Sequence, residues 1–165
     1  MGSHAAAAPV QGARHLFLMV FKATPDDKLE WRPAAVDGAD ATNILEIARH
    51  CIAADGYFTF MFTESKVPAH EEGAADWFSS ASFAGEGPAA GVSNKAGLIK
   101  ALEHEAAKTD AVIGAVTPEA WAEMVEAPWM TATRAEFLGL LAGHWSYHAG
   151  QVAYIQRLYG DNSFG

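Results

Sequence analysis

Residues 133–160 read TRAEFLGLLAGHWSYHAGQVAYIQRLYG. Apolar side chains recur here every three or four positions, which is the period of one face of an α-helix. The positions on that face are Phe137, Leu140, Leu141, His144, His148, Val152 and Ile155. Thr133 and Glu136 have the spacing of a capping box, and Gly160 stands where a left-handed glycine ends a helix. The stretch therefore predicts a long helix that places two histidines on its buried face.

Helical periodicity recurs in three more segments, and Arg14 falls on the apolar side of the first of them. The first of these helices is predicted over about 8–22. The second begins at a cap, either Asp40 or Thr42, and ends at about 62. The third covers about 94–115 and follows a cap at Ser93. A short helical turn is predicted in TPEAWAEMV, where Thr117 caps and Pro118 takes the first helical position. We find no convincing strand alternation, so the sequence predicts an all-α four-helix bundle.

The segment between the second and third predicted helices covers residues 64–92 and is rich in Gly, Ser and Pro. It is far longer than the turn that joins two adjacent antiparallel helices. A connection of this length can cross the whole bundle, so we expect the second and third helices to run parallel.

Composition limits the functions that are plausible for this chain. It has 165 residues, half of them apolar, and a net charge of −9. The length suits a single domain over 1–165, with Met1–His4 resembling an expression-tag remnant. The acidic balance argues against nucleic acid and against an anionic membrane, since both attract clustered Lys and Arg, and no apolar run approaches the length of a membrane span. The single cysteine, Cys51, excludes an intrachain disulfide and favours the cytoplasm.

The two histidines of the fourth helix are the first candidates for chemistry. His144 and His148 are one turn apart, so their rings lie on one face. A buried pair of imidazoles needs partners for its nitrogens, and a metal ion supplies them while both rings stay neutral. The alternative is that one histidine is a hydrogen-bonded core residue and the other points to solvent.

A third ligand must come from another helix, and His50 is the best candidate. It lies about nine residues into the second predicted helix, roughly 14 Å along it, while the pair lies roughly 15–21 Å along the fourth helix. The other histidines do not share this level: His15 is on a less certain face, His70 is in the loop, and His104 is on a predicted surface. Cys51 points about 100° away from His50 and is interpreted as core.

Several neighbours of this predicted centre have two interpretations each. Glu46 precedes His50 by one turn and could accept its second ring N–H, or it is an exposed carboxylate. Gln151 could orient a ligand or bond to the second helix. We interpret Trp31, Trp129 and Trp145 as packing residues, and the sequence does not decide whether Tyr57 or Tyr147 places a hydroxyl near the site.

The chain resembles the DinB-like family of four-helix bundles in three segments. These are LEWRP (29–33), ILEIARHCIAADGYF (44–58) and residues 133–160, and their order and spacing fit almost the whole chain. The specific features are one histidine on the second helix, His50, and an H-x-x-x-H-x-G-Q pattern from His144 to Gln151.

This resemblance implies an up-down-down-up bundle with a long crossover between helices two and three. It also implies a divalent metal ion bound by His50, His144 and His148. Some relatives are thiol-dependent enzymes, namely mycothiol-dependent maleylpyruvate isomerase and bacillithiol or glutathione transferases, while many others have no established activity. The long loop matches no enzyme signature, which leaves the substrate open.

Three neutral imidazoles leave a divalent ion with its full charge and an open position, as in catalytic sites. The leading hypothesis is thus a metal-dependent S-transferase or hydrolase that activates a low-molecular-weight thiol or water against a small electrophile. The alternatives are a non-enzymatic metal- or ligand-binding bundle and a purely structural bundle. All-nitrogen ligation suits Zn, Ni, Fe or Co. We expect a small-molecule substrate, no nucleic-acid or membrane partner, and keep a homodimer as one alternative.

Overall fold

The computed structural model describes residues 3–34, 41–67 and 89–163. Its main elements are four long helices and a short hairpin: α1 (Ser3–Ala23), α2 (Ile44–Thr63), α3 (Lys95–Ala115), β1 (Met124–Ala127), β2 (Met130–Thr133) and α4 (Arg134–Leu158). Single 3₁₀ turns, η1 (Asp26–Lys28) and η4 (Ala120–Ala122), lie in two of the connections.

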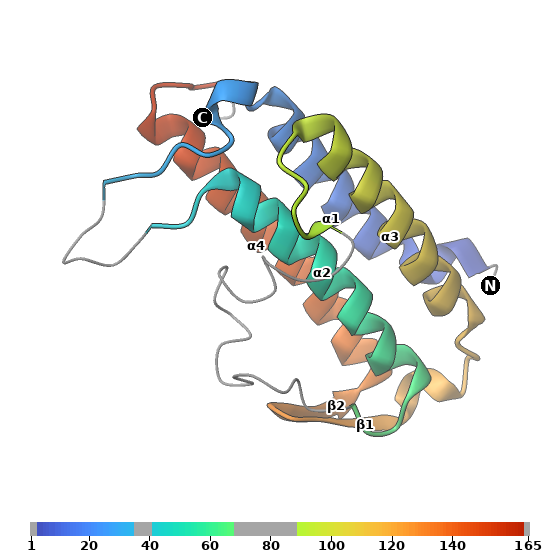
Figure 1. The fold of residues 1–165 in the computed structure, drawn as a ribbon. Coiled ribbons are helices and arrows are strands. Elements are labelled where there is room, and N and C mark those ends of the chain that lie inside the picture. The colour runs from blue at the N-terminus through green and yellow to red at the C-terminus, as the bar shows by residue number, and fades with distance from the viewer. Residues whose placement is uncertain (1–2, 35–40, 68–88, 164–165) are drawn as a thin grey trace.

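The four helices form a bundle with two parallel pairs of neighbours. α1 packs against α4 and α3, while α2 packs against α3 and α4. Figure 1 shows that α1 and α4 run one way along the bundle while α2 and α3 run the other way. This is the up-down-down-up order, so the four-helix bundle and the parallel second and third helices are confirmed. Most of the predicted crossover lies outside the described residues.

The helix starts differ from the predictions at three of the four helices. α1 begins at Ser3, five residues earlier than predicted, because alanine, the strongest helix former, occupies positions 5–8. α2 begins after Asn43, whose side chain accepts a hydrogen bond from the Glu46 N–H in a capping box. α3 is capped by Asn94 rather than Ser93. The Thr133–Glu136 capping box of α4 and the positive φ of 97° at Gly160 are as predicted.

The hairpin between α3 and α4 was not predicted. Its strands have four residues each and pair in antiparallel register, with Ala127 opposite Met130 across the turn. Four residues are too few to display a strand period against the helical pattern that follows. The turn predicted in TPEAWAEMV shrinks to η4, where Thr117 Oγ1 accepts from the Ala120 N–H at 3.3 Å, and the segment continues as β1. The Val67 N–H also donates to the Glu126 carbonyl at 2.8 Å, which ties the end of α2 to the hairpin.

A buried charge network joins all four helices at one level of the core. Arg14 of α1 donates two hydrogen bonds of 2.8 Å to the Asp55 carboxylate of α2 and one of 2.5 Å to Asp110 of α3. The indole N–H of Trp145 on α4 donates to Asp55 at 3.1 Å. Arg14, Asp55 and Trp145 are each at most 3% exposed. The side of α1 on which Arg14 falls is therefore buried as predicted, and Asp55 supplies the charge that makes this burial tolerable.

Around this network the core is aliphatic and aromatic, and it includes Phe17, Phe21, Phe137 and the fully buried Cys51. No helix among the described residues combines the length and the apolar character that crossing a membrane requires.

Candidate metal centre

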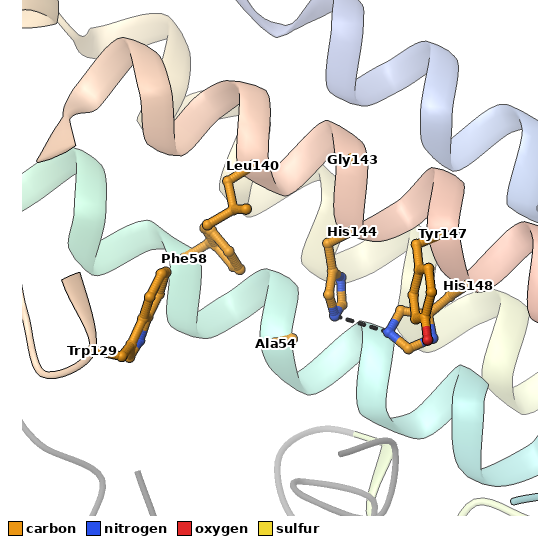
Figure 2. A pocket seen from close by; sticks show the side chains of 8 residues that line it. All are labelled: Ala54, Phe58, Trp129, Leu140, Gly143, His144, Tyr147 and His148. Carbon is orange, nitrogen blue, oxygen red and sulfur yellow. Dashed lines mark hydrogen bonds between the residues drawn. The ribbon is translucent and has the colours of Figure 1, made fainter. Parts of the chain in front are cut away.

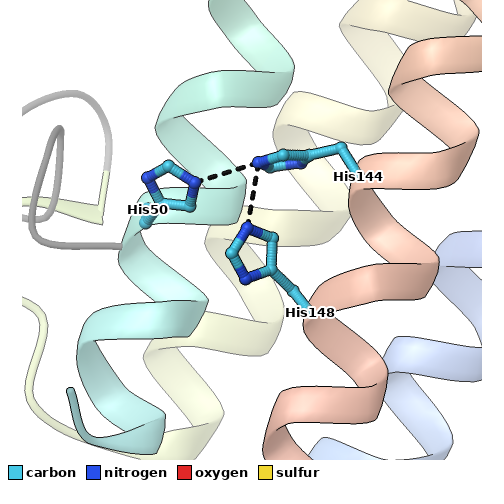
Figure 3. Close-up of side chains that lie close together, drawn as sticks. All are labelled: His50, His144 and His148. Atoms are coloured by element: carbon cyan, nitrogen blue, oxygen red, sulfur yellow. Dashed lines mark hydrogen bonds between the residues drawn. The ribbon is translucent and has the colours of Figure 1, made fainter. Parts of the chain in front are cut away.

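His50, His144 and His148 come together between α2 and α4. Nε2 of His144 lies 2.9 Å from Nε2 of His50 and 3.1 Å from Nε2 of His148. Figure 3 shows the three rings converging on one point, one from α2 and two from successive turns of α4. α2 begins at Ile44, so His50 lies six residues into its helix instead of nine, and the three rings still meet.

The surroundings of His144 and His148 keep both of these imidazoles neutral. His50 and His148 are buried and His144 is half-buried. Loss of hydration lowers the pKa of His144 well below its usual value, and the adjacent His148 and His50 lower it further. Burial, followed by the charge on His50, lowers the pKa of His148 to about 4. At neutral pH both rings therefore present lone pairs.

A directed chain of hydrogen bonds orients His148. Its Nδ1 lies 2.6 Å from Oε1 of Gln151, and because that oxygen only accepts, Nδ1 carries the proton. The lone pair of His148 is then on Nε2, which faces the other two rings. Gln151 in turn donates from Nε2 to the Tyr147 hydroxyl oxygen at 3.0 Å. The predicted role of Gln151 as an orienting residue thus has a defined partner, His148.

The other residues singled out in the sequence lie elsewhere. Both carboxylate oxygens of Glu46 are held by Arg32, and one also accepts from the Asn43 N–H, so this carboxylate serves the start of α2. His15 and His104 are exposed. His70 lies outside the described residues. Cys51 is fully buried, and burial, with Asp55 nearby, raises the pKa of its thiol well above the usual value, which suits its interpretation as core.

The tryptophans pack, as predicted, but two of them do more. Trp31 packs edge-on against Tyr159, and Trp129 packs edge-on against Phe137. Trp129 also lines a pocket beside the histidines, and Trp145 holds Asp55 through its indole N–H. Tyr147 is 61% exposed at this pocket, whereas Tyr57 packs edge-on against Phe60.

The pocket next to the triad has a volume of about 270 Å³. Figure 2 shows His144 and His148 towards one end of it and Phe58 with Trp129 towards the other. Its remaining lining residues are Ala54, Leu140, Gly143 and Tyr147. Of these lining residues, the sequence marks the two histidines and Tyr147 as candidates for chemistry, and it offers no local signal for the others. Phe58 and Leu140 belong to ordinary apolar stripes until the facing helix shows that they border a hollow.

The triad passes a simple test of its fitness to hold a metal ion. The candidate ligand atoms of the three rings all lie within 4.8 Å of one another. Nε2 of His148 carries a lone pair. A proton on Nε2 of His144 can form a hydrogen bond with only one of the two neighbouring Nε2 atoms, so the other close contact has no hydrogen bond. A cation at the point of convergence would satisfy all three Nε2 atoms, and imidazole nitrogen is a preferred ligand of divalent transition metals.

Comparison with known proteins places this arrangement in context. The family model of the DinB superfamily matches residues 10–152, a range that includes all three histidines. No curated protein matches the sequence.

A similar fold is found in a solved structure, that of YfiT from Bacillus subtilis, a probable metal-dependent hydrolase with an unusual four-helix bundle topology. The two structures superpose with a TM-score of 0.68 at 14% sequence identity, over 97% of this chain and 89% of YfiT. At this identity the likeness concerns the fold.

Proposed function

Because the chain belongs to the DinB superfamily, we propose that it is a metal-dependent enzyme whose divalent transition-metal ion is held by His50, His144 and His148. In this proposal the site activates water or a low-molecular-weight thiol for attack on a small electrophile. The observation that carries the proposal is the convergence of three Nε2 atoms, with 2.9 and 3.1 Å between neighbours, in the interior of the bundle.

The donor set suits catalysis better than a structural role. Closed structural sites of zinc have four protein ligands, whereas catalytic sites have three and leave a position for water or substrate. Within the described residues, the group of side chains placed to hold an ion consists of the three histidines alone, with no fourth His, Cys, Asp or Glu. When bound, the ion would supply Lewis acidity, which polarises a carbonyl group and lowers the pKa of water or a thiol.

The chain's own residues would prepare the site for this chemistry. Oε1 of Gln151 accepts a hydrogen bond from Nδ1–H of His148 and so keeps the lone pair of Nε2 free for the ion. The Tyr147 hydroxyl oxygen accepts from Gln151, so its own proton is available to a ligand in the adjacent pocket. The apolar walls of that pocket would exclude water from the reacting groups.

Two observations bear on the choice between water and thiol. YfiT, the structural neighbour, is a probable hydrolase, and the thiol-dependent relatives implied by the sequence resemblance favour a transferase. The two activities separate in one assay that follows the release of 4-nitrophenolate from a 4-nitrophenyl ester by the metal-loaded protein, with and without an added low-molecular-weight thiol. Activity that appears only with the thiol indicates a transferase.

The metal assignment is tested by elemental analysis of protein purified without an affinity tag. We expect about one ion per chain in the wild type and well under one in His50→Ala, His144→Ala and His148→Ala, because two imidazoles cannot close a tight site. His15→Ala and His104→Ala are matched controls that should keep the full complement. A full complement in His50→Ala would show that the third ligand is misassigned, and activity that survives in metal-free His148→Ala would refute the proposed enzyme.

The role of Gln151 is tested in the same series. Gln151→Leu should retain the site but weaken metal affinity by roughly 10–100-fold, the usual effect of losing a residue that orients a ligand. Tyr147→Phe should leave metal affinity unchanged, because the Tyr147 hydroxyl contacts Gln151 and is one hydrogen bond further from the His148 ring.

A further inference from the structure

Two small residues, one on α2 and one on α4, line the pocket beside the triad. Ala54 on α2 and Gly143 on α4 both line it, and they carry the smallest side chains of its walls. A Cβ added at Gly143 would meet no atom within 4 Å, so the space next to this glycine is open. A larger side chain at either position would take up part of this space.

The walls of the pocket are apolar at the end away from the histidines. Phe58, Leu140 and Trp129 form that end, and Trp129 is held in place by its edge-on contact with Phe137, with ring centroids 5.7 Å apart. None of the described residues that line the pocket is Asp, Glu, Lys or Arg. A charged group placed at this end would find no counter-ion among the side chains that line it, so the lining selects against charge.

The size of the pocket further limits the kinds of ligand that it can hold. A dry cavity of about 150 Å³ already accepts benzene, and this pocket has about 270 Å³. Typical sites for drug-sized ligands begin near roughly 300 Å³. The space therefore suits one aromatic ring with a short substituent.

We propose that this pocket binds an uncharged group of the size of one aromatic ring. Such a group, seated against Phe58 and Trp129, would place a polar substituent next to His144, His148 and the Tyr147 hydroxyl. In so far as it rests on the proposed function, the inference names the substrate class: a small neutral molecule that carries an aromatic or similarly sized apolar group directly beside its reacting atoms.

The test compares two metal-binding probes on the zinc-loaded protein, benzohydroxamate and acetohydroxamate, which share a chelating group and differ in a phenyl ring. Titration calorimetry should show benzohydroxamate binding at least about tenfold more tightly, as expected when a ring is removed from water. A carboxylate at the para position of the ring should abolish most of this advantage. Equal affinity of the two hydroxamates would overturn the proposal.

Matched glycine variants locate the effect in the pocket. Gly143→Leu should remove the advantage of benzohydroxamate and leave acetohydroxamate binding within about twofold. Gly139→Leu is the control, since Gly139 is also on α4, has no atom within 4 Å of an added Cβ and does not line the pocket. An equal loss in both variants, or no loss in either, would contradict the assignment.

A metal-free arm separates failure of this inference from failure of the proposed function. Saturation-transfer NMR with benzamide on the metal-free protein should give a signal in the wild type and in Gly139→Leu but not in Gly143→Leu. A protein that takes up no metal yet shows this pattern refutes the metal centre and supports the pocket. A protein that loads zinc but gives no benzamide signal and no preference for benzohydroxamate retains the metal centre and refutes the pocket.

Discussion

At the scale of single residues, the surroundings of His148 in the histidine triad oppose its protonation. His148 is buried against His50 and His144, and its Nδ1 proton is held by Gln151. A proton added at Nε2 would face two other imidazoles and little water. The ring therefore resists protonation, with its pKa lowered to about 4, first by burial and then by His50.

This lowered pKa predicts how the stability of the metal-free protein depends on pH. In the unfolded chain the ring titrates near 6.5, so below that pH the unfolded state binds a proton that the folded state refuses until about pH 4. The contribution of His148 to the free energy of unfolding is complete above about pH 6.5 and is lost as the pH falls towards 4. As the pH falls from 7 to 5, uptake of a proton by His148 in the unfolded chain should lower the free energy of unfolding by about 2 kcal/mol.

Urea denaturation of chelator-treated protein at pH 7 and pH 5 measures this change. His148→Asn removes the titrating ring and should lose distinctly less stability over the same interval, and His15→Ala, at an exposed position of α1, is the control. Equal losses in wild type and His148→Asn would show that the ring is protonated in the folded protein at pH 5.

At the scale of elements, the position at which α4 begins determines the side of the helix on which His144 and His148 lie. Thr133 Oγ1 accepts from the Glu136 N–H at 3.2 Å, and Glu136 Oε2 accepts from the Thr133 N–H at 2.8 Å. These two bonds satisfy groups that would otherwise be left unpaired at the helix end, where the chain leaves β2. The hairpin and the cap together define where α4 begins.

Loss of this cap should be measurable as a loss of stability. Thr133→Ala should lower the unfolding free energy by about 1 kcal/mol, the usual cost of removing such a side chain. Thr117→Ala is the matched control, because its hydroxyl accepts a similar bond of 3.3 Å at a three-residue turn instead of at the start of a long helix, and it should cost clearly less. Urea unfolding followed by circular dichroism compares the two, and equal costs would contradict a special role for the α4 cap.

At the scale of the whole molecule, the Arg14–Asp55 network determines how the four helices fit together. Arg14 reaches Asp55 and Asp110 on two other helices, and Trp145 of the fourth helix donates to the same Asp55. Trp145 directly follows His144 in the chain. Its bond to Asp55 of α2 and its edge-on contact with Phe17 of α1 hold the rotation of α4 at which His144 faces His50 of α2. The network therefore supports the site without contacting it.

Removing one partner of this network should be costly, because the other partners stay buried. Asp55→Ala leaves Arg14 with Asp110 alone and leaves the Trp145 N–H without its acceptor, so we expect a loss of about 3–5 kcal/mol in urea unfolding. Lys66→Ala, which breaks the exposed 3.0 Å pair with Glu126, should cost less than about 1 kcal/mol. The double variant Arg14→Met/Asp55→Leu should lose less than the sum of its single changes, since it leaves no unpaired charge between these two positions. Additive losses would indicate that the pair is not coupled.

The sequence by itself determined the features whose signal is local. The helical period of residues 133–160, the Thr133–Glu136 capping box and Gly160 are all expressed within a few turns of chain, and the structure contains each of them. The one-turn spacing of His144 and His148 likewise ensures that both rings lie on one face. The length of the segment after the second helix indicated the crossover, and with it the parallel course of α2 and α3.

Only the tertiary structure decided what depends on the facing element. The choice of Asn43 over Asp40 or Thr42 as the α2 cap, the four-residue strands of the hairpin and the engagement of Glu46 by Arg32 could not be read from periodicity. The pocket is a joint product of small residues on α2 and α4, and the burial of Arg14 is possible only because Asp55 meets it across the core. For the pocket and for Arg14 the physical reason is the same: contacts between segments far apart in the chain leave no periodic trace in either segment.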